Sequence, residues 1–221
     1  MSPGEALLVK LIVYGGWLFS LSLHEFAHGF VAYLGGDRGI KRRGYLTLNP
    51  LRFMNSRQSF LLPMLFLLLG GLGLPGGATY IDPQALRSKG WETAVSLAGP
   101  AANLLIGGLI GLLFGYDVLD PETALGAGFA CLAGLQFGAM LFNLIPFPPL
   151  NGFGALRPHL SPSMQAQGQQ LNQSGYMLLI LLFWFIPGVS AVFWHYIYIV
   201  ADVQHVPAYA IYDGFQAARF W

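Results

Sequence analysis

Four long apolar runs constrain this chain more than any other feature of its sequence. They cover residues 6–34, 94–116, 124–145 and 176–200, and each is long enough to cross about 30 Å of hydrocarbon as a helix. Of the 221 residues, 55% are hydrophobic and only 10% are charged, and the mean hydropathy is +0.56. The pattern predicts an all-α polytopic membrane protein with about four transmembrane helices, in which residues 1–221 form a single membrane-embedded domain.

Net charge and cysteine content argue against a nucleic-acid-binding protein and against a protein held together by disulfides or thiolate-bound metal. A net charge of +1 leaves no excess positive field for a nucleic-acid backbone, so binding to DNA or RNA is not expected. The single cysteine, Cys131, cannot form an internal disulfide or a thiolate metal cluster. Residues 161–174, rich in Gln, Ser and Pro, are the one segment that resembles a linker.

A fifth apolar run, residues 60–74, is too short for an ordinary transmembrane helix. It has fifteen residues, contains Pro63, and ends in the glycine-rich stretch 70–77. This length and composition favour a re-entrant segment that enters the membrane and returns to the same side. The predicted fold class also allows a small membrane-associated β element.

Basic residues distinguish the two sides of the membrane. If residues 60–74 are re-entrant, nine of the eleven Lys and Arg residues share one face, and the acidic loop 117–122 lies on the other. The basic side is expected to be cytoplasmic, which places the N-terminus outside. If the run crossed the membrane instead, Arg87 and Lys89 would move outside. The basic cluster 38–43 could also recruit anionic lipid or an acidic partner. The nine residues are Arg38, Lys41, Arg42, Arg43, Arg52, Arg57, Arg87, Lys89 and Arg157.

Three ionisable residues lie together in the first run, where such groups are energetically unfavourable without a partner. They are His24, Glu25 and His28, in the string HEFAH. Positions i and i+4 share a helix face, so both imidazoles can bind one metal ion while Glu25 lies beside it as a general base. This is the arrangement of zinc hydrolases. The alternative is a polar cluster that joins two helices.

Two histidines leave a zinc site short of a third protein ligand. The third run ends in FNLIPFPPLNGF, residues 142–153, whose prolines cannot continue a helix. An extended backbone here could aim a side chain at the metal or pair with an extended peptide. The oxygen ligands that it offers are Asn143 and Asn151, although Asn151 and Gly152 are also a turn-forming pair.

Asn103 lies within the second run, at a depth where an amide needs a partner. It could steady a substrate backbone or an oxyanion, or it could tie two helices together. Asn143 is the second candidate for substrate or oxyanion binding.

Four short strings of this sequence together resemble motifs of the site-2 protease family of intramembrane zinc metalloproteases. They are HEFAH, SLAGPAANLL (residues 96–105), FNLIPFPPLNGF and GYLTLNPLRF (residues 44–53). The last is similar to the compact bacterial branch that lacks an appended peptide-binding domain. The resemblance implies that His24 and His28 bind one Zn²⁺ per chain and that Glu25 is the catalytic base. It also implies that residue 151 is the third zinc ligand.

The resemblance further implies an endopeptidase that cleaves transmembrane segments of membrane-anchored regulators. Its expected location is the bacterial inner membrane, with the active site toward the cytoplasmic side. Its expected partners are membrane lipid and the transmembrane segments of its substrates. No feature of the sequence specifies an oligomeric state. One position departs from the family, because Asn151 stands where the family has aspartate. An amide is a weaker zinc ligand than a carboxylate. The alternative is therefore an impaired or inactive homologue, natural or engineered, that binds transmembrane helices.

Overall fold

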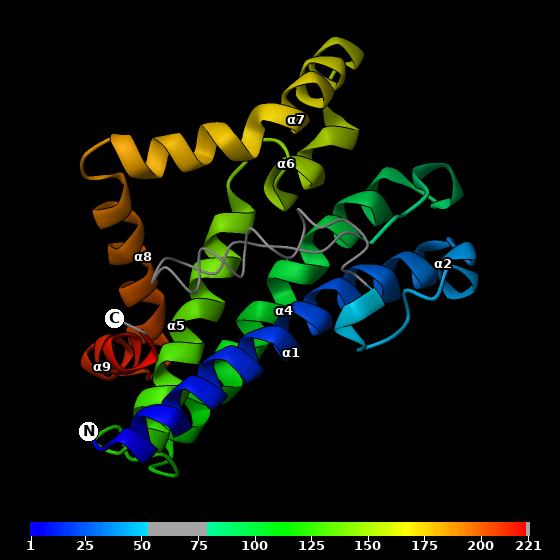
Figure 1. Ribbon diagram of the computed structural model, residues 1–221. Coiled ribbons are helices and arrows are strands. Elements are labelled where there is room, and N and C mark those ends of the chain that lie inside the picture. Colours follow the sequence, from blue (N-terminus) through cyan, green and yellow to red (C-terminus); the bar gives the residue numbers. More distant parts are fainter. Residues whose placement is uncertain (53–78, 220–221) are drawn as a thin grey trace.

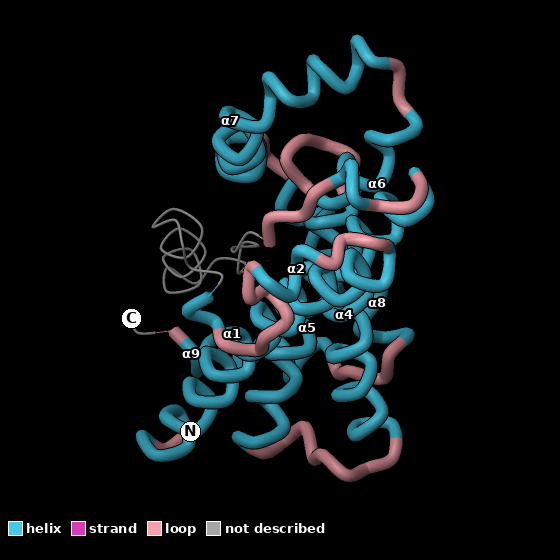
Figure 2. The backbone as a smooth tube through the Cα atoms, turned by 90° about the vertical axis from the view of Figure 1, so that its right-hand side faces the viewer, coloured by secondary structure: helices cyan, strands magenta, loops and turns pink. Residues whose placement is uncertain are grey.

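The computed structural model describes residues 1–52 and 79–219, and all regular structure in these two ranges is helical (Figures 1 and 2). This confirms the predicted all-α fold. The predicted re-entrant segment, residues 60–74, lies outside the described residues. The α-helices are α1 (Pro3–Gly35), α2 (Gly39–Arg42), α4 (Lys89–Gly115), α5 (Ala124–Leu144), α6 (Asn151–Leu156), α7 (Pro162–Phe185), α8 (Val189–Val203) and α9 (Ala208–Ala218). Three short 3-10 helices are η1 (Pro50–Arg52), η2 (Pro83–Ala85) and η3 (Arg157–His159).

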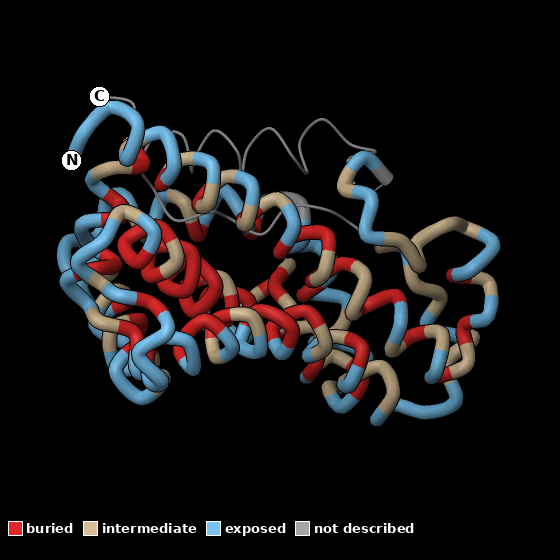
Figure 3. Tube along the Cα trace, turned by 90° about the horizontal axis from the view of Figure 1, so that it is seen from below, coloured by how far each residue is buried: buried red, intermediate tan, exposed pale blue. Residues whose placement is uncertain are grey.

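Helices α1, α4 and α5 form the bundle that carries the site (Figure 1). Each is long and apolar enough to cross a membrane, as the sequence predicts. Each is also preceded by a capping residue whose side-chain oxygen accepts a backbone N–H of the first turn: Ser2, Ser88 and Thr123. Helix α5 is the most buried of the three and packs against α1, α4 and α9. Figure 3 shows buried residues along the middle of the bundle and exposed residues around it.

The fourth predicted span is bent into a corner. Its two parts, residues 174–185 of α7 and 189–203 of α8, meet at 94°. Pro187 has no N–H to continue the helix, and Gly188 has a φ of 89°, in the left-handed region that favours glycine. Figure 1 shows α7 lying across one end of the bundle and α8 returning along its side. Counting the bent pair as one span gives the four predicted from the sequence.

The polar segment 161–174 is not a linker. It forms the first half of α7, which begins at Pro162 after the capping residue Ser161. Gly175 brings this helix against the proline-rich turn, because a Cβ at Gly175 would lie 2.1 Å from the carbonyl oxygen of Pro148. Helix α7 is therefore positioned by the same turn that leads into α6.

The two ends of the bundle differ in charge. The C-terminal end of α1, the helix α2, the N-terminal end of α4 and η3 lie toward one end, and the N-terminus and the loop 116–123 lie at the other (Figure 1). Seven of the nine basic positions predicted to share a face lie on or next to these elements of the first end. Arg52 belongs to η1, and Arg57 lies outside the described residues.

Candidate metal centre

Helix α1 places His24 and His28 side by side on one face. Their Nε2 atoms are 3.1 Å apart, and their rings meet edge to face with centroids 4.8 Å apart. Both side chains are buried, at 5% and 7% exposure. The structure thus brings the two imidazoles together as the i, i+4 spacing predicts.

Each imidazole is oriented by a bond from its other nitrogen to α4. His24 Nδ1 lies 2.8 Å from Asn103 Oδ1, and His28 Nδ1 lies 2.6 Å from the carbonyl oxygen of Val95. Because both partners are oxygen acceptors, each Nδ1 carries the proton and each Nε2 keeps its lone pair. Metal-binding histidines show this arrangement, in which one nitrogen donates to an acceptor and the other faces the ion.

The amide of Asn151 faces the same point from the first residue of α6. Its Nδ2 lies 3.3 Å from Nε2 of both His24 and His28. A half-turn about the Cβ–Cγ bond of an asparagine exchanges its amide nitrogen for its oxygen, so Oδ1 can face this point equally well. The three groups form a triangle with sides of 3.1 to 3.3 Å.

The size of this triangle fits one zinc ion. Two ligands that are each about 2.0–2.1 Å from a tetrahedral Zn²⁺ are about 3.3 Å apart. The observed separations of the three groups match this value. Among the described residues, no group of three His, Cys, Asp or Glu side chains comes together in this way, and the third corner of the triangle is the amide of Asn151.

Gly99 lets α4 pass directly against both rings. A Cβ at this position would lie 2.3 Å from Nε2 of His24 and 2.4 Å from Nε2 of His28. These distances are shorter than any van der Waals contact, so a larger residue would displace the imidazoles. The backbone of α4 therefore forms one wall of the triangle.

Glu25 is held on the neighbouring face of α1 by Thr79. Its Oε2 accepts the backbone N–H of Thr79 at 3.0 Å and the hydroxyl of Thr79 at 2.9 Å. The carboxylate is 6% exposed and close enough to His28 to interact with it electrostatically. Tyr176 of α7 also lies within electrostatic range of Glu25.

Three residues near the site carry no signal in the sequence that would predict them there: Thr79, Val95 and Tyr176. Thr79 lies 54 positions from Glu25, and Val95 contributes only a backbone oxygen, so neither belongs to a local motif. Tyr176 lies at the start of an apolar run and carried no signal that separates it from an interfacial tyrosine.

The two remaining predicted site residues, Asn103 and Asn143, differ in their contacts. Asn103 contacts His24 and thereby ties α1 to α4, which is one of the two alternatives set out for it. Asn143 is buried in α5, and its Nδ2 donates to the carbonyl oxygen of Ala139 in the same helix, at 2.9 Å. A role in binding substrate or an oxyanion stays a prediction for both.

Comparison with known proteins identifies the family. No family model matches the sequence, and no solved structure matches it. The chain is 41% identical over 215 residues to "Putative zinc metalloprotease Rip2" of Mycolicibacterium smegmatis. This alignment covers 96% of this chain and 82% of the relative. The Rip2 protein of Mycobacterium tuberculosis is 41% identical over 214 residues, with the same coverage. "Putative zinc metalloprotease YwhC" of Bacillus subtilis is 31% identical over 189 residues, covering 80% of this chain and 79% of the relative.

The names of these relatives describe zinc metalloproteases, which supports a metalloprotease function and implies zinc. Their similarity extends over 80% to 96% of this chain and 79% to 82% of the relatives. The chain belongs to the site-2 protease family of zinc metalloproteases.

Proposed function

We propose that this chain is an intramembrane zinc endopeptidase of the HExxH type. His24, His28 and Asn151 would hold the ion, and Glu25 would be the catalytic base. The observation that carries the proposal is the triangle of Nε2, Nε2 and amide, with both Nδ1 atoms already bonded elsewhere. Two imidazole lone pairs, and an amide whose oxygen a half-turn brings to the same point, are a donor set suited to a divalent cation.

The residues around the triangle supply the steps of peptide hydrolysis. Bound zinc supplies Lewis-acid activation of water and of the scissile carbonyl. Glu25 accepts the proton of the attacking water and delivers it to the nitrogen of the leaving amine. Thr79 fixes the carboxylate through two bonds to Oε2, which limits its motion before and after proton transfer.

The depth of the site favours transmembrane segments as substrates. Glu25 lies ten residues before the C-terminal end of α1 at Gly35, which is about 15 Å along the helix. A peptide bond at that depth must come from a chain that is itself in the membrane and locally unwound. The non-helical turn 145–150 precedes Asn151 and offers backbone groups with which an extended substrate could pair. We propose membrane-anchored regulators as the physiological substrates.

Replacing Asn151 with Asp tests the position of the third ligand. We expect zinc affinity to rise at least roughly tenfold, because a carboxylate adds a negative charge beside a divalent cation. Cleavage of a model transmembrane substrate should rise with it. Zinc content by mass spectrometry and cleavage in detergent or nanodiscs measure the two effects, and Asn172→Asp, an exposed asparagine of α7, is the matched control. Unchanged zinc affinity in Asn151→Asp would remove residue 151 from the ligand set.

A second candidate function is a non-catalytic homologue that binds transmembrane helices. The amide at position 151 favours it, since none of the three corners of the triangle, as the described residues form it, is a carboxylate that would offset the charge of an ion. The same experiment separates the two functions. The binding function would be supported if the unaltered chain holds no zinc and cleaves no substrate, while the Asn151→Asp variant binds zinc and cleaves the substrate.

The charge of the two ends of the bundle supports a cytoplasmic position for the basic end. We propose that the N-terminal end of α4 faces the cytoplasm of a bacterial inner membrane, and that the loop 116–123 faces outside. In a Cys131→Ala background, a cysteine at Lys89 should resist an impermeant thiol reagent added to intact cells, and a cysteine at Asp117 should react. Labelling of both residues from the same side would contradict this orientation.

A further inference from the structure

We infer that Glu92 and Thr93 of α4, together with Arg157 and His159 of η3, hold Asn151 at the metal position. We call these four residues the α4–η3 clamp. The inference rests on the proposed zinc site, and it concerns what keeps the third ligand in place.

Helix α6 has little local support of its own. It is six residues long, begins at Asn151, and has no side-chain cap at its N-terminus. The segment before it, residues 145–150, is proline-rich and non-helical. A side chain on such a short helix keeps its position only if the rest of the helix is anchored.

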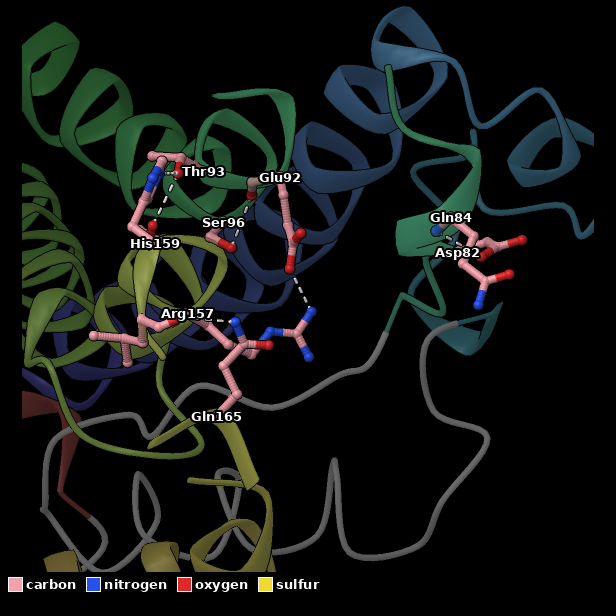
Figure 4. A network of polar contacts seen from close by, with 10 residues as sticks. Asp82, Gln84, Glu92, Thr93, Ser96, Arg157, His159 and Gln165 are labelled. Carbon is pink, nitrogen blue, oxygen red and sulfur yellow. Dashed lines mark hydrogen bonds and ion pairs between the residues drawn. The ribbon is translucent and has the colours of Figure 1, made fainter. Parts of the chain in front are cut away.

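The clamp anchors α6 at its C-terminal end. The hydroxyl of Thr93 donates to the carbonyl oxygen of Ala155 at 2.8 Å, and Nε2 of His159 lies 3.0 Å from the same hydroxyl. Since the one proton of that hydroxyl goes to Ala155, His159 must donate to Thr93. Nearby, the guanidinium of Arg157 forms an ion pair with Glu92. Figure 4 shows Glu92 and Thr93 on α4 facing Arg157 and His159.

The partly buried position of the ion pair adds to its value as an anchor. The side chains of Arg157 and Glu92 are 31% and 21% exposed, so water screens them less than a surface pair. The two helices also touch beside the clamp, because a Cβ at Gly154 would lie 2.9 Å from Oγ of Ser96. These contacts leave α6 little freedom to move relative to α4.

Helix α4 is therefore the common frame for all three proposed ligands. Val95 orients His28, Asn103 orients His24, and the clamp fixes the helix that carries Asn151. Helix α4 itself contributes no ligand to the triangle. Its residues 92–103 nevertheless set the separation between the imidazole pair on α1 and the amide on α6, so loosening the clamp should open the triangle on one side.

Metal affinity tests the clamp more directly than stability does. In the full-length chain in detergent, the Kd for Co²⁺ and its d–d absorption report the ligand set. We expect Thr93→Val combined with Arg157→Gln to raise the Kd roughly tenfold and to weaken the d–d bands. Losses of this size are usual at other metal sites when a residue that orients a ligand is removed. Thr93→Ser keeps the hydroxyl and should retain normal affinity. Glu122→Gln, at the other end of the bundle, is the control for loss of a charge.

A double-mutant cycle shows whether the clamp acts through Asn151. In an Asn151→Ala background there is no amide to position, so the clamp variants should leave the Kd for Co²⁺ unchanged. The charge-swapped pair Glu92→Arg with Arg157→Glu should recover part of the affinity lost in Glu92→Arg alone. Equal losses of affinity with and without Asn151, or normal affinity in Thr93→Val/Arg157→Gln, would overturn the inference. An unaltered chain and an Asn151→Asp variant that both fail to bind metal would instead overturn the proposed function, and the inference with it.

Discussion

Replacing Glu25 with Gln is expected to lower the cleavage rate of a transmembrane substrate by roughly 10²–10⁴-fold, the usual contribution of a general base. Glutamine has nearly the same shape as glutamate but cannot accept the proton of water. The variant should keep its fold and its zinc, because Glu25 is not a corner of the triangle formed by His24, His28 and Asn151.

The bonds of Thr79 make this substitution conservative. In the Glu25→Gln variant, the side-chain amide oxygen could still accept the N–H and the hydroxyl of Thr79, which now bind Oε2 of Glu25. Initial cleavage rates with a fluorogenic transmembrane substrate, compared with Glu122→Gln, provide the measurement. Cleavage at the unaltered rate in Glu25→Gln would show that another group takes the proton.

Gly99→Ala is expected to remove most of the bound zinc. The added Cβ would lie 2.3 to 2.4 Å from Nε2 of both histidines, so it would occupy the space of the ligand atoms. Both rings are fixed by bonds from Nδ1 and cannot both turn aside without losing Asn103 or Val95. We therefore expect loss of both metal and activity, with the helical fold retained.

A glycine elsewhere in the bundle provides the matched control for this substitution. Gly15 lies in α1, and a Cβ there would have no neighbour within 4 Å. Gly15→Ala should therefore keep its zinc, and the metal content of the two variants is the comparison to make. Stoichiometric zinc in Gly99→Ala would mean that the ion does not lie between the two imidazoles.

Local periodicity explains what could be predicted from the sequence. The HEFAH spacing fixes two imidazoles on one helix face, and the prolines after residue 145 predict that the chain leaves the helix before Asn151. Both signals lie within a few residues, so they do not depend on how the helices pack. The three spans of α1, α4 and α5 were predictable for the same reason.

Long-range packing explains what could not be predicted. Thr79, the partner of Glu25, is 54 positions away along the chain, and Val95, the partner of His28, is 67 positions away. The corner at Pro187 lies inside an apolar run whose length alone suggests a straight crossing. A proline within such a run can either kink a helix or end it, and packing against the rest of the bundle decides which.

The zinc content of the purified chain tests most directly whether His24 and His28 hold one divalent ion together with residue 151. We expect about one zinc per chain, X-ray absorption that shows two imidazole nitrogens in its coordination shell, and loss of the metal in His24→Ala and in His28→Ala. A chain that cleaves its substrate without zinc, or that keeps its zinc when both histidines are replaced, would contradict this assignment.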